Sequence, residues 1–212
     1  MPKIRTATLN DHHDAVWAAI VKALERLLAE KTYDELSVGE IAAAAGMARN
    51  TLYNYAPDKA TLVAKAAEIS NQDFYESIRE LADGHDAPPR KLARIMAAVI
   101  GWYGATEHRP LLVQTLFRPV PDEVHKRAGA PMVRASRFVV RVVEEGLASG
   151  DFRGADNAEM MEDFLAGAIT RAAMRVVEAP EQAATISAEM QAFALRALGC
   201  ATPLSLVQQD NP

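Results

Sequence analysis

Apolar residues recur every three to four positions along most of the chain, and no stretch shows the strict alternation of a half-buried strand. The first such segment begins at a capping residue, Asn10 or Asp11, and ends near Lys31. Its inward positions are Val16, Ile20, Leu24, Leu27 and Leu28. A period of about 3.6 residues is that of an amphipathic helix. The pattern predicts an all-α fold of about nine helices.

Capping and breaking residues predict where the next helices begin and end. The stretch from Ser37 to Glu40 has the spacing of a capping box, which starts a short second helix through Ala45. Gly46 supplies the positive φ of a sharp helix exit, and a third helix is expected over 48–55. Pro57 and Asp58 then end that helix and cap a long fourth one, expected over 59–82.

The remainder of the chain is also predicted to be helical. Two prolines between Gly84 and Arg90 mark a break, after which apolar periodicity resumes. The expected helices cover about 90–106, 110–117, 122–127, 131–149, 155–178 and 180–198. Residues 201–212 are short and polar and are expected to form a flexible tail.

The two short helices around Gly46 have the spacing of a helix-turn-helix. Ala42 lies four residues before the glycine and allows a close helix crossing, while Leu52, six residues after it, packs the second helix onto the first. The outward positions between them are Arg49, Asn50, Thr51 and Asn54. Arginine can bond guanine and asparagine can bond adenine. Two core helices of an ordinary helical protein are the alternative, but the capping box and this polar face favour the DNA-binding motif.

Residues 31–62, KTYDELSVGEIAAAAGMARNTLYNYAPDKATL, resemble the DNA-binding signature of the tetracycline-repressor (TetR) family of transcriptional regulators. The resemblance implies a helix-turn-helix DNA-binding domain over 1–58. It also implies base reading by Arg49, Asn50 and Thr51, and phosphate contacts by Ser37, Tyr53, Tyr55 and Lys59. The sequence departs from the family pattern at Thr32, at Ala48, where a Ser or Thr usually caps the helix, and at Ala56, where a bulky aromatic is usual.

The last two expected helices carry small and apolar residues at spacings that suit close helix–helix packing. Packing within one subunit would explain these residues. The resemblance to TetR proteins implies instead that the two helices pair with those of a second subunit. The predicted interface residues are Met161, Phe164, Leu165, Ala168, Met190 and Phe193.

Aromatic and methionine residues gather on the middle helices, where the resemblance implies a ligand cavity. Residues of these types make an adaptable apolar lining, although they are equally typical of a core. The predicted ligand-binding residues are Phe74, Met96, Trp102, Tyr103, Phe117 and Phe138, with Glu107, His108, His125 and Arg141 as polar candidates nearby. Residues 59–200 are thus expected to form a ligand-binding and dimerisation domain.

Composition narrows the function without deciding it. A net charge of −5 does not by itself indicate a nucleic-acid partner, so DNA binding must depend on local geometry. The single cysteine, Cys200, excludes an internal disulfide. The five histidines lack metal-ligand spacing, and no phosphate-binding loop or nucleophile elbow occurs. We therefore expect no catalytic residues, metal or cofactor, no membrane segment, and a cytoplasmic location.

Together these features predict a homodimeric regulator, most simply a repressor. It would bind a palindromic operator in double-stranded DNA and be released by an unknown small-molecule effector of apolar character. One alternative is a DNA-binding protein of the same fold that has no small-molecule ligand. The other is a helical enzyme or carrier in which the break at Gly46 is incidental.

Overall fold

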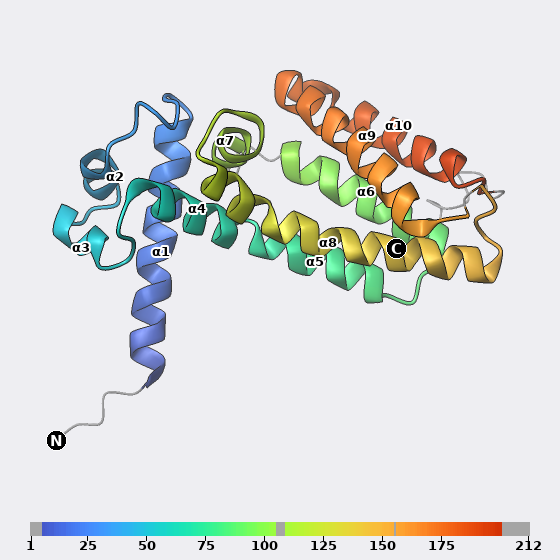
Figure 1. Cartoon of the computed structure of the whole chain (residues 1–212), viewed down its shortest axis with the longest axis horizontal. Coiled ribbons are helices and arrows are strands. Elements are labelled where there is room, and N and C mark those ends of the chain that lie inside the picture. The colour runs from blue at the N-terminus through green and yellow to red at the C-terminus, as the bar shows by residue number, and fades with distance from the viewer. Residues whose placement is uncertain (1–5, 105–108, 155, 201–212) are drawn as a thin grey trace. The chain divides into compact units, whose positions relative to one another are not determined.

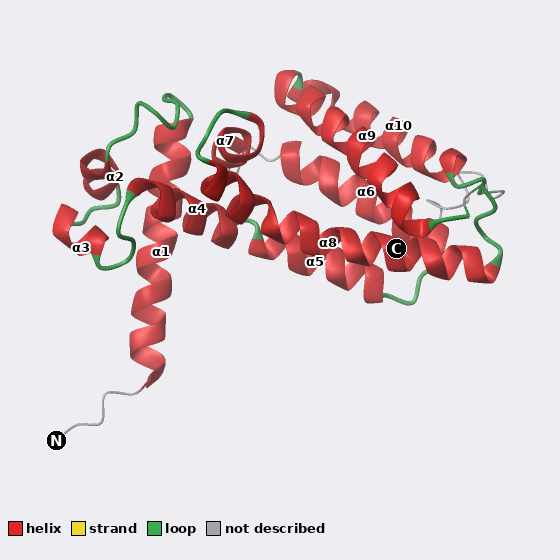
Figure 2. Cartoon of the chain, viewed as in Figure 1, coloured by secondary structure: helices red, strands yellow, loops and turns green. Residues whose placement is uncertain are grey.

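The computed structural model describes residues 6–104, 109–154 and 156–200. Within these ranges the chain forms ten α-helices, one π-helical turn and one 3₁₀ turn, with no strand (Figure 2). The predicted all-α fold is confirmed. None of the described helices combines the length and the apolar character that crossing a membrane requires. The predicted tail over 201–212 and the candidates Glu107 and His108 lie outside the described residues.

The chain divides into two compact units, the first of which contains the N-terminal helices. Its elements are α1 (Thr6–Leu28), α2 (Val38–Ala44), α3 (Arg49–Tyr53), α4 (Lys59–Ser70), α7 (Arg109–Leu112), the π-helical turn η1 (Val113–Phe117) and the first part of α8 (Asp122–Ser149). Helix α1 packs against α2, α4 and α7. Trp17, Ile20 and Leu24 of α1 therefore lie at the centre of this unit's core.

The second unit is built around one central helix. Its elements are α5 (Gln72–Asp83), α6 (Pro88–Gly104), the remainder of α8, α9 (Ala158–Glu178), the 3₁₀ turn η2 (Pro180–Gln182) and α10 (Ala183–Ala197). Helix α6 contacts α5, α9 and α10, and α9 and α10 lie side by side (Figure 1). Leu92, Ile95 and Ile100 of α6 are fully buried, so this helix supplies the middle of the second core.

The boundary between the compact units differs from the one expected after residue 58. Helix α4 belongs to the first unit because Leu62, Val63 and Ala66 are buried in its core. The segment from α7 to Ala130 returns to that unit, with Leu111 buried in the same core. No local sequence pattern indicates that this segment packs with the first unit. As functional regions, 1–58 and 59–200 stay a prediction.

Two predicted helix boundaries are wrong. The helix expected over 59–82 breaks at Asn71 into α4 and α5. Asn71 is buried and its Nδ2 donates a hydrogen bond to the carbonyl oxygen of Ala128 (3.1 Å), a tertiary contact that helix periodicity cannot reveal. Conversely, Pro131 lies inside α8 instead of starting a new helix. A proline removes one backbone hydrogen bond, yet α8 continues through this position from buried Ala128 to buried Ala135.

Smaller differences occur at other helix ends. Helix α1 begins at Thr6, before the expected cap, and ends at Leu28. The segment expected as one helix over 110–117 is α7 followed directly by η1. Helix α9 starts after Asn157, whose side chain accepts a hydrogen bond from the Met160 amide (2.9 Å).

We expect Gly146→Ala to destabilise the second unit by about 1–3 kcal/mol. A Cβ at this position of α8 would overlap the ring of Phe152, which is 2% exposed. Gly101→Ala, on exposed α6 surface where a Cβ meets open space, should instead stabilise by about 0.5–1 kcal/mol. Urea unfolding of both variants checks the pair, and equal stabilities would contradict the packing around Phe152.

Candidate functional sites

The start of α2 is fixed by the predicted capping box. The Glu40 amide donates to Ser37 Oγ (3.2 Å), and the Ser37 amide donates to Glu40 Oε2 (3.0 Å). Gly46 has a φ of +71°, which confirms the sharp exit expected there. Both ends of the turn between α2 and α3 are thereby defined by local chemistry.

Burial of three side chains sets the crossing of α2 and α3. Ile41, Ala42 and Leu52 are at most 1% exposed and belong to the core of the first unit. Helix α3 is shorter than expected, covering only Arg49–Tyr53, and its N-cap residue Ala48 makes no side-chain hydrogen bond. The sequence predicts that this helix lacks an N-terminal side-chain cap, and the start of α3 indeed has no such hydrogen bond.

The polar side chains of α3 are exposed as the helical periodicity predicts. Arg49, Asn50, Thr51 and Asn54 are all exposed. Arg49 Nη2 donates to the Tyr53 hydroxyl (3.1 Å), and the guanidinium lies 5.7 Å from the centre of the Tyr53 ring. These contacts orient the arginine along the exposed face of α3.

Tyr55, predicted to contact phosphate, is only half-buried and is packed against α1. Its ring centroid lies 6.1 Å from that of Trp17 in an edge-on arrangement and 5.5 Å from that of His13. The ring therefore fastens the end of the α3 segment to α1, whatever its hydroxyl binds.

Two other residues that were expected to contact phosphates already make hydrogen bonds within the protein. Lys59 Nζ donates to the carbonyl oxygens of Tyr33 (2.9 Å) and Leu36 (3.0 Å), and lies 4.3 Å from the Tyr33 ring centre. The Ser37 hydroxyl donates to Glu40 Oε2 (2.7 Å). Lys59 thus keeps one N–H for another partner, whereas a phosphate at Ser37 Oγ would compete with Glu40.

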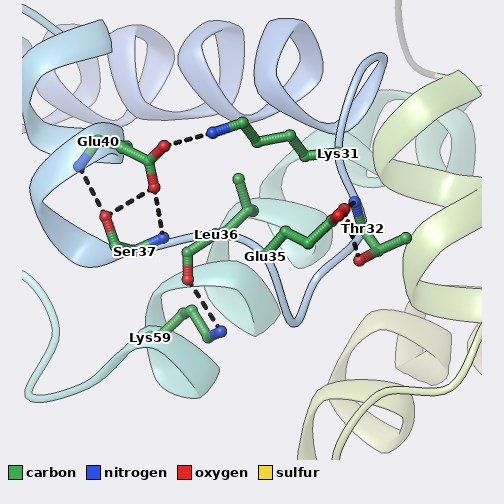
Figure 3. A network of polar contacts seen from close by, with 7 residues as sticks. All are labelled: Lys31, Thr32, Glu35, Leu36, Ser37, Glu40 and Lys59. Carbon is green, nitrogen blue, oxygen red and sulfur yellow. Dashed lines mark hydrogen bonds and ion pairs between the residues drawn. The ribbon is translucent and has the colours of Figure 1, made fainter.

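The loop before α2 is held by charged hydrogen bonds (Figure 3). Lys31 pairs with Glu40, and together with Ser37 it lowers the pKa of Glu40 from 4.5 to about 2. Glu35 accepts hydrogen bonds from the amide (2.8 Å) and the hydroxyl (2.9 Å) of Thr32. The hydrogen bond from the Thr32 amide is the main cause that lowers the pKa of Glu35. Hydrogen bonds of Glu35 and Glu40 therefore hold the loop that leads into the helix-turn-helix.

The second unit contains a cavity of about 400 Å³, within the size range of small-molecule sites. Helices α5, α6, α8 and α9 line it, and its walls are mostly apolar. Three of the predicted ligand-binding residues, Phe74, Met96 and Tyr103, are in the lining. Burial raises the pKa of Tyr103 to about 12, so its phenol is neutral.

The other three predicted ligand-binding residues are not in the lining. Trp102 packs against Phe74, with ring centroids 5.4 Å apart and tilted planes, and Phe138 packs against Tyr75 in a similar way. Phe117 ends η1 in the first unit. Aromatic content alone could not distinguish cavity wall from supporting core.

The polar candidates near the cavity also have other partners. Arg141 pairs with Asp83 and lies over the Phe138 ring (5.4 Å). His125 Nδ1 is 3.1 Å from the carbonyl oxygen of Thr115 in the first unit. The sequence interpretation missed Glu162, Asp163 and Thr170 of α9, which line the cavity.

An apolar surface lies on α9 and α10, where the partner subunit is expected. Phe164 is 62% exposed and Phe193 44% exposed, while Met161 and Ala168 are half-buried. Leu165 and Met190 were expected on the same surface, but they are 2% and 5% exposed because their side chains pack into the core of their own subunit. Met160, also of α9, is 55% exposed.

Within the described part of the chain, no three His, Cys, Asp or Glu side chains are grouped to hold a metal ion.

Comparison with known proteins agrees with the helix-turn-helix geometry. Residues 20–75 match the model of bacterial regulatory proteins of the tetR family. The matched region contains α2, α3 and α4. No curated protein sequence matches the chain.

Solved structures of transcriptional regulators share the fold over nearly their full length. One is the transcriptional regulator FadR from Bacillus subtilis in complex with stearoyl-CoA, with a TM-score of 0.75 and 18% identity over 85% of this chain and 98% of that one. Another is NalD of Pseudomonas aeruginosa, the secondary repressor of the MexAB-OprM multidrug efflux pump, with a TM-score of 0.73 and 20% identity over 87% and 98%. At these identities the likeness establishes the tetR-like fold alone.

We expect Glu40→Gln to lower stability at neutral pH and to have less effect in acid. The folded-state pKa of Glu40 is depressed from 4.5 to about 2. Its stabilisation is therefore present above pH 4.5 and is lost as the pH falls through 2. Urea midpoints of the two proteins should converge over this range. Glu144→Gln, which removes an exposed carboxylate from α8, is the control, and a Glu40 difference that persisted at the lowest pH would contradict the network.

Proposed function

We propose that this chain is a homodimeric repressor that binds a palindromic operator and is released by a small molecule in the cavity of its second unit. The observation that carries the proposal is the exposed row of Arg49, Asn50 and Thr51 on a helix whose position is fixed by the turn at Gly46 and by buried Leu52. The cytoplasm is the compartment in which such a regulator meets DNA.

DNA contacts in the proposal divide between base reading and backbone contacts. Arg49, Asn50 and Thr51 read bases in the major groove, and exposed Asn54 supports them. Tyr53, Tyr55 and the remaining N–H of Lys59 contact phosphates, which position the protein without specifying sequence. A phosphate at Ser37 would have to compete with Glu40, which accepts from both the hydroxyl and the amide of Ser37.

Dimerisation in the proposal uses the exposed apolar surface of α9 and α10. Burial of Met160, Phe164 and Phe193 against the same surface of a second copy would remove the largest exposed apolar side chains of these helices from water. A two-fold dimer then presents two copies of α3 to the two halves of a palindrome.

Ligand response in the proposal uses the cavity between α5, α6, α8 and α9. Its volume and apolar walls suit a small, largely apolar molecule. FadR of Bacillus subtilis, a neighbour in fold, was crystallised with stearoyl-CoA, and NalD is a repressor. A regulator of the same fold without a ligand is the alternative, and the cavity disfavours it.

We expect Arg49→Ala to weaken binding to a duplex selected by the wild-type protein by about 1–3 kcal/mol, with relaxed preference at one base pair. Arg137→Ala, which removes an exposed arginine from α8, is the matched control and should bind as wild type. Fluorescence anisotropy on selected and scrambled duplexes measures both. Equal losses on the two duplexes would remove Arg49 from base reading.

We expect Phe164→Glu to yield monomers, because a buried carboxylate without a partner strongly opposes association. Ala148→Glu places the same charge on an exposed position of α8 and should leave the dimer intact. Sedimentation velocity distinguishes the two states. A Phe164→Glu protein that sedimented as a dimer would move the interface away from this surface.

A further inference from the structure

The cavity of the second unit has one wall of a different chemical character. Glu162 and Asp163, from adjacent positions of α9, both line it. None of the residues that line it is a lysine, arginine or histidine. Among the described residues of the cavity wall, the formal charges are therefore all negative.

Neither carboxylate is neutralised by another residue in the described part of the chain. No ion pair or side-chain hydrogen bond joins Glu162 or Asp163 to another described residue. Their neighbours at three and four positions along α9 are Ala158, Glu159, Met160, Leu165, Ala166 and Gly167, so the helix itself supplies no cation. These two charges are available to a molecule that enters the cavity.

Their placement is not accounted for by the start of the helix. Acidic residues stabilise the positive end of a helix mainly within its first turn. Glu159 occupies that turn, whereas Glu162 and Asp163 follow it. Burial and the neighbouring Asp163 both raise the pKa of half-buried Glu162, because each disfavours its ionised form.

We infer that the cavity binds an amphiphilic cation, an apolar body that carries an amine or quaternary ammonium group, and that it disfavours acyl anions. The inference rests on the proposed function of the cavity as the effector site. The apolar body would contact Phe74, Met96 and Ile169, and the cationic head would lie against Glu162 and Asp163. FadR of Bacillus subtilis, bound to the anion stearoyl-CoA, shares the fold, so ligand charge would differ between proteins of one architecture.

The test compares three probes that share one tail: decyltrimethylammonium, decanoate and decanol, each below its micellar concentration. Trp102 packs against Phe74 of the cavity wall, so its fluorescence reports occupancy. The full-length chain is used with Trp17→Phe, which removes the other tryptophan. We expect the cation to bind on the order of tenfold more tightly than decanoate, with an affinity that falls as salt is added.

The double variant Glu162→Gln with Asp163→Asn should remove most of the ratio between cation and anion affinity. Glu159→Gln, which removes an acid of α9 outside the cavity lining, is the control and should keep the ratio. The salt dependence of the wild-type protein provides an independent test if the double variant fails to fold.

The outcomes separate this inference from the proposed function. Decanoate binding as tightly as the cation would overturn the charge assignment and leave a neutral or anionic effector in the same cavity. Failure of all three probes would overturn both the ligand class and the cavity as a sensor site. Cation preference in a chain that selects no DNA sequence would refute the proposed function and leave the binding site standing.

Discussion

Helix α3, the proposed base-reading helix, depends on packing for its stability, because a helix of five residues is not stable on its own in water. Helix α3 covers only Arg49–Tyr53, and Ala48 gives it no side-chain cap. Its position comes from Leu52, 1% exposed in the core around α1 and α4, and from the turn that Gly46 permits. The burial of Leu52 therefore fixes the side of α3 on which the polar side chains are exposed.

Charge in the first unit serves mainly to hold this arrangement. Lys59, Lys31 and Glu40 use their polar atoms to connect the loop before α2 to its neighbours (Figure 3). A chain with a net charge of −5 can therefore present a few cations in defined positions without a basic surface. In the second unit, by contrast with its paired Arg141 and Asp83, the cavity-wall residues Glu162 and Asp163 have no cationic partner among the described residues.

Local chemistry made the helix-turn-helix and the start of α4 predictable from sequence. The capping box at Ser37, the positive φ at Gly46 and the cap at Asp58 depend on residues within a few positions of one another, and all three are present. The break at Asn71 and the continuity through Pro131 depend on contacts with distant residues, which periodicity does not encode. For the same reason the cavity includes Phe74 and Tyr103 but not Phe117, and Leu165 and Met190 pack inward.

The central claim is that occupancy of the cavity and binding of DNA are coupled. Thermodynamic linkage requires that a ligand weaken DNA binding by the same factor by which DNA weakens ligand binding. The most direct measurement is calorimetric titration of decyltrimethylammonium into the protein alone and into the protein saturated with a selected duplex. The account predicts a dissociation constant about 5- to 150-fold higher in the presence of DNA. Identical dissociation constants in the two titrations would contradict it.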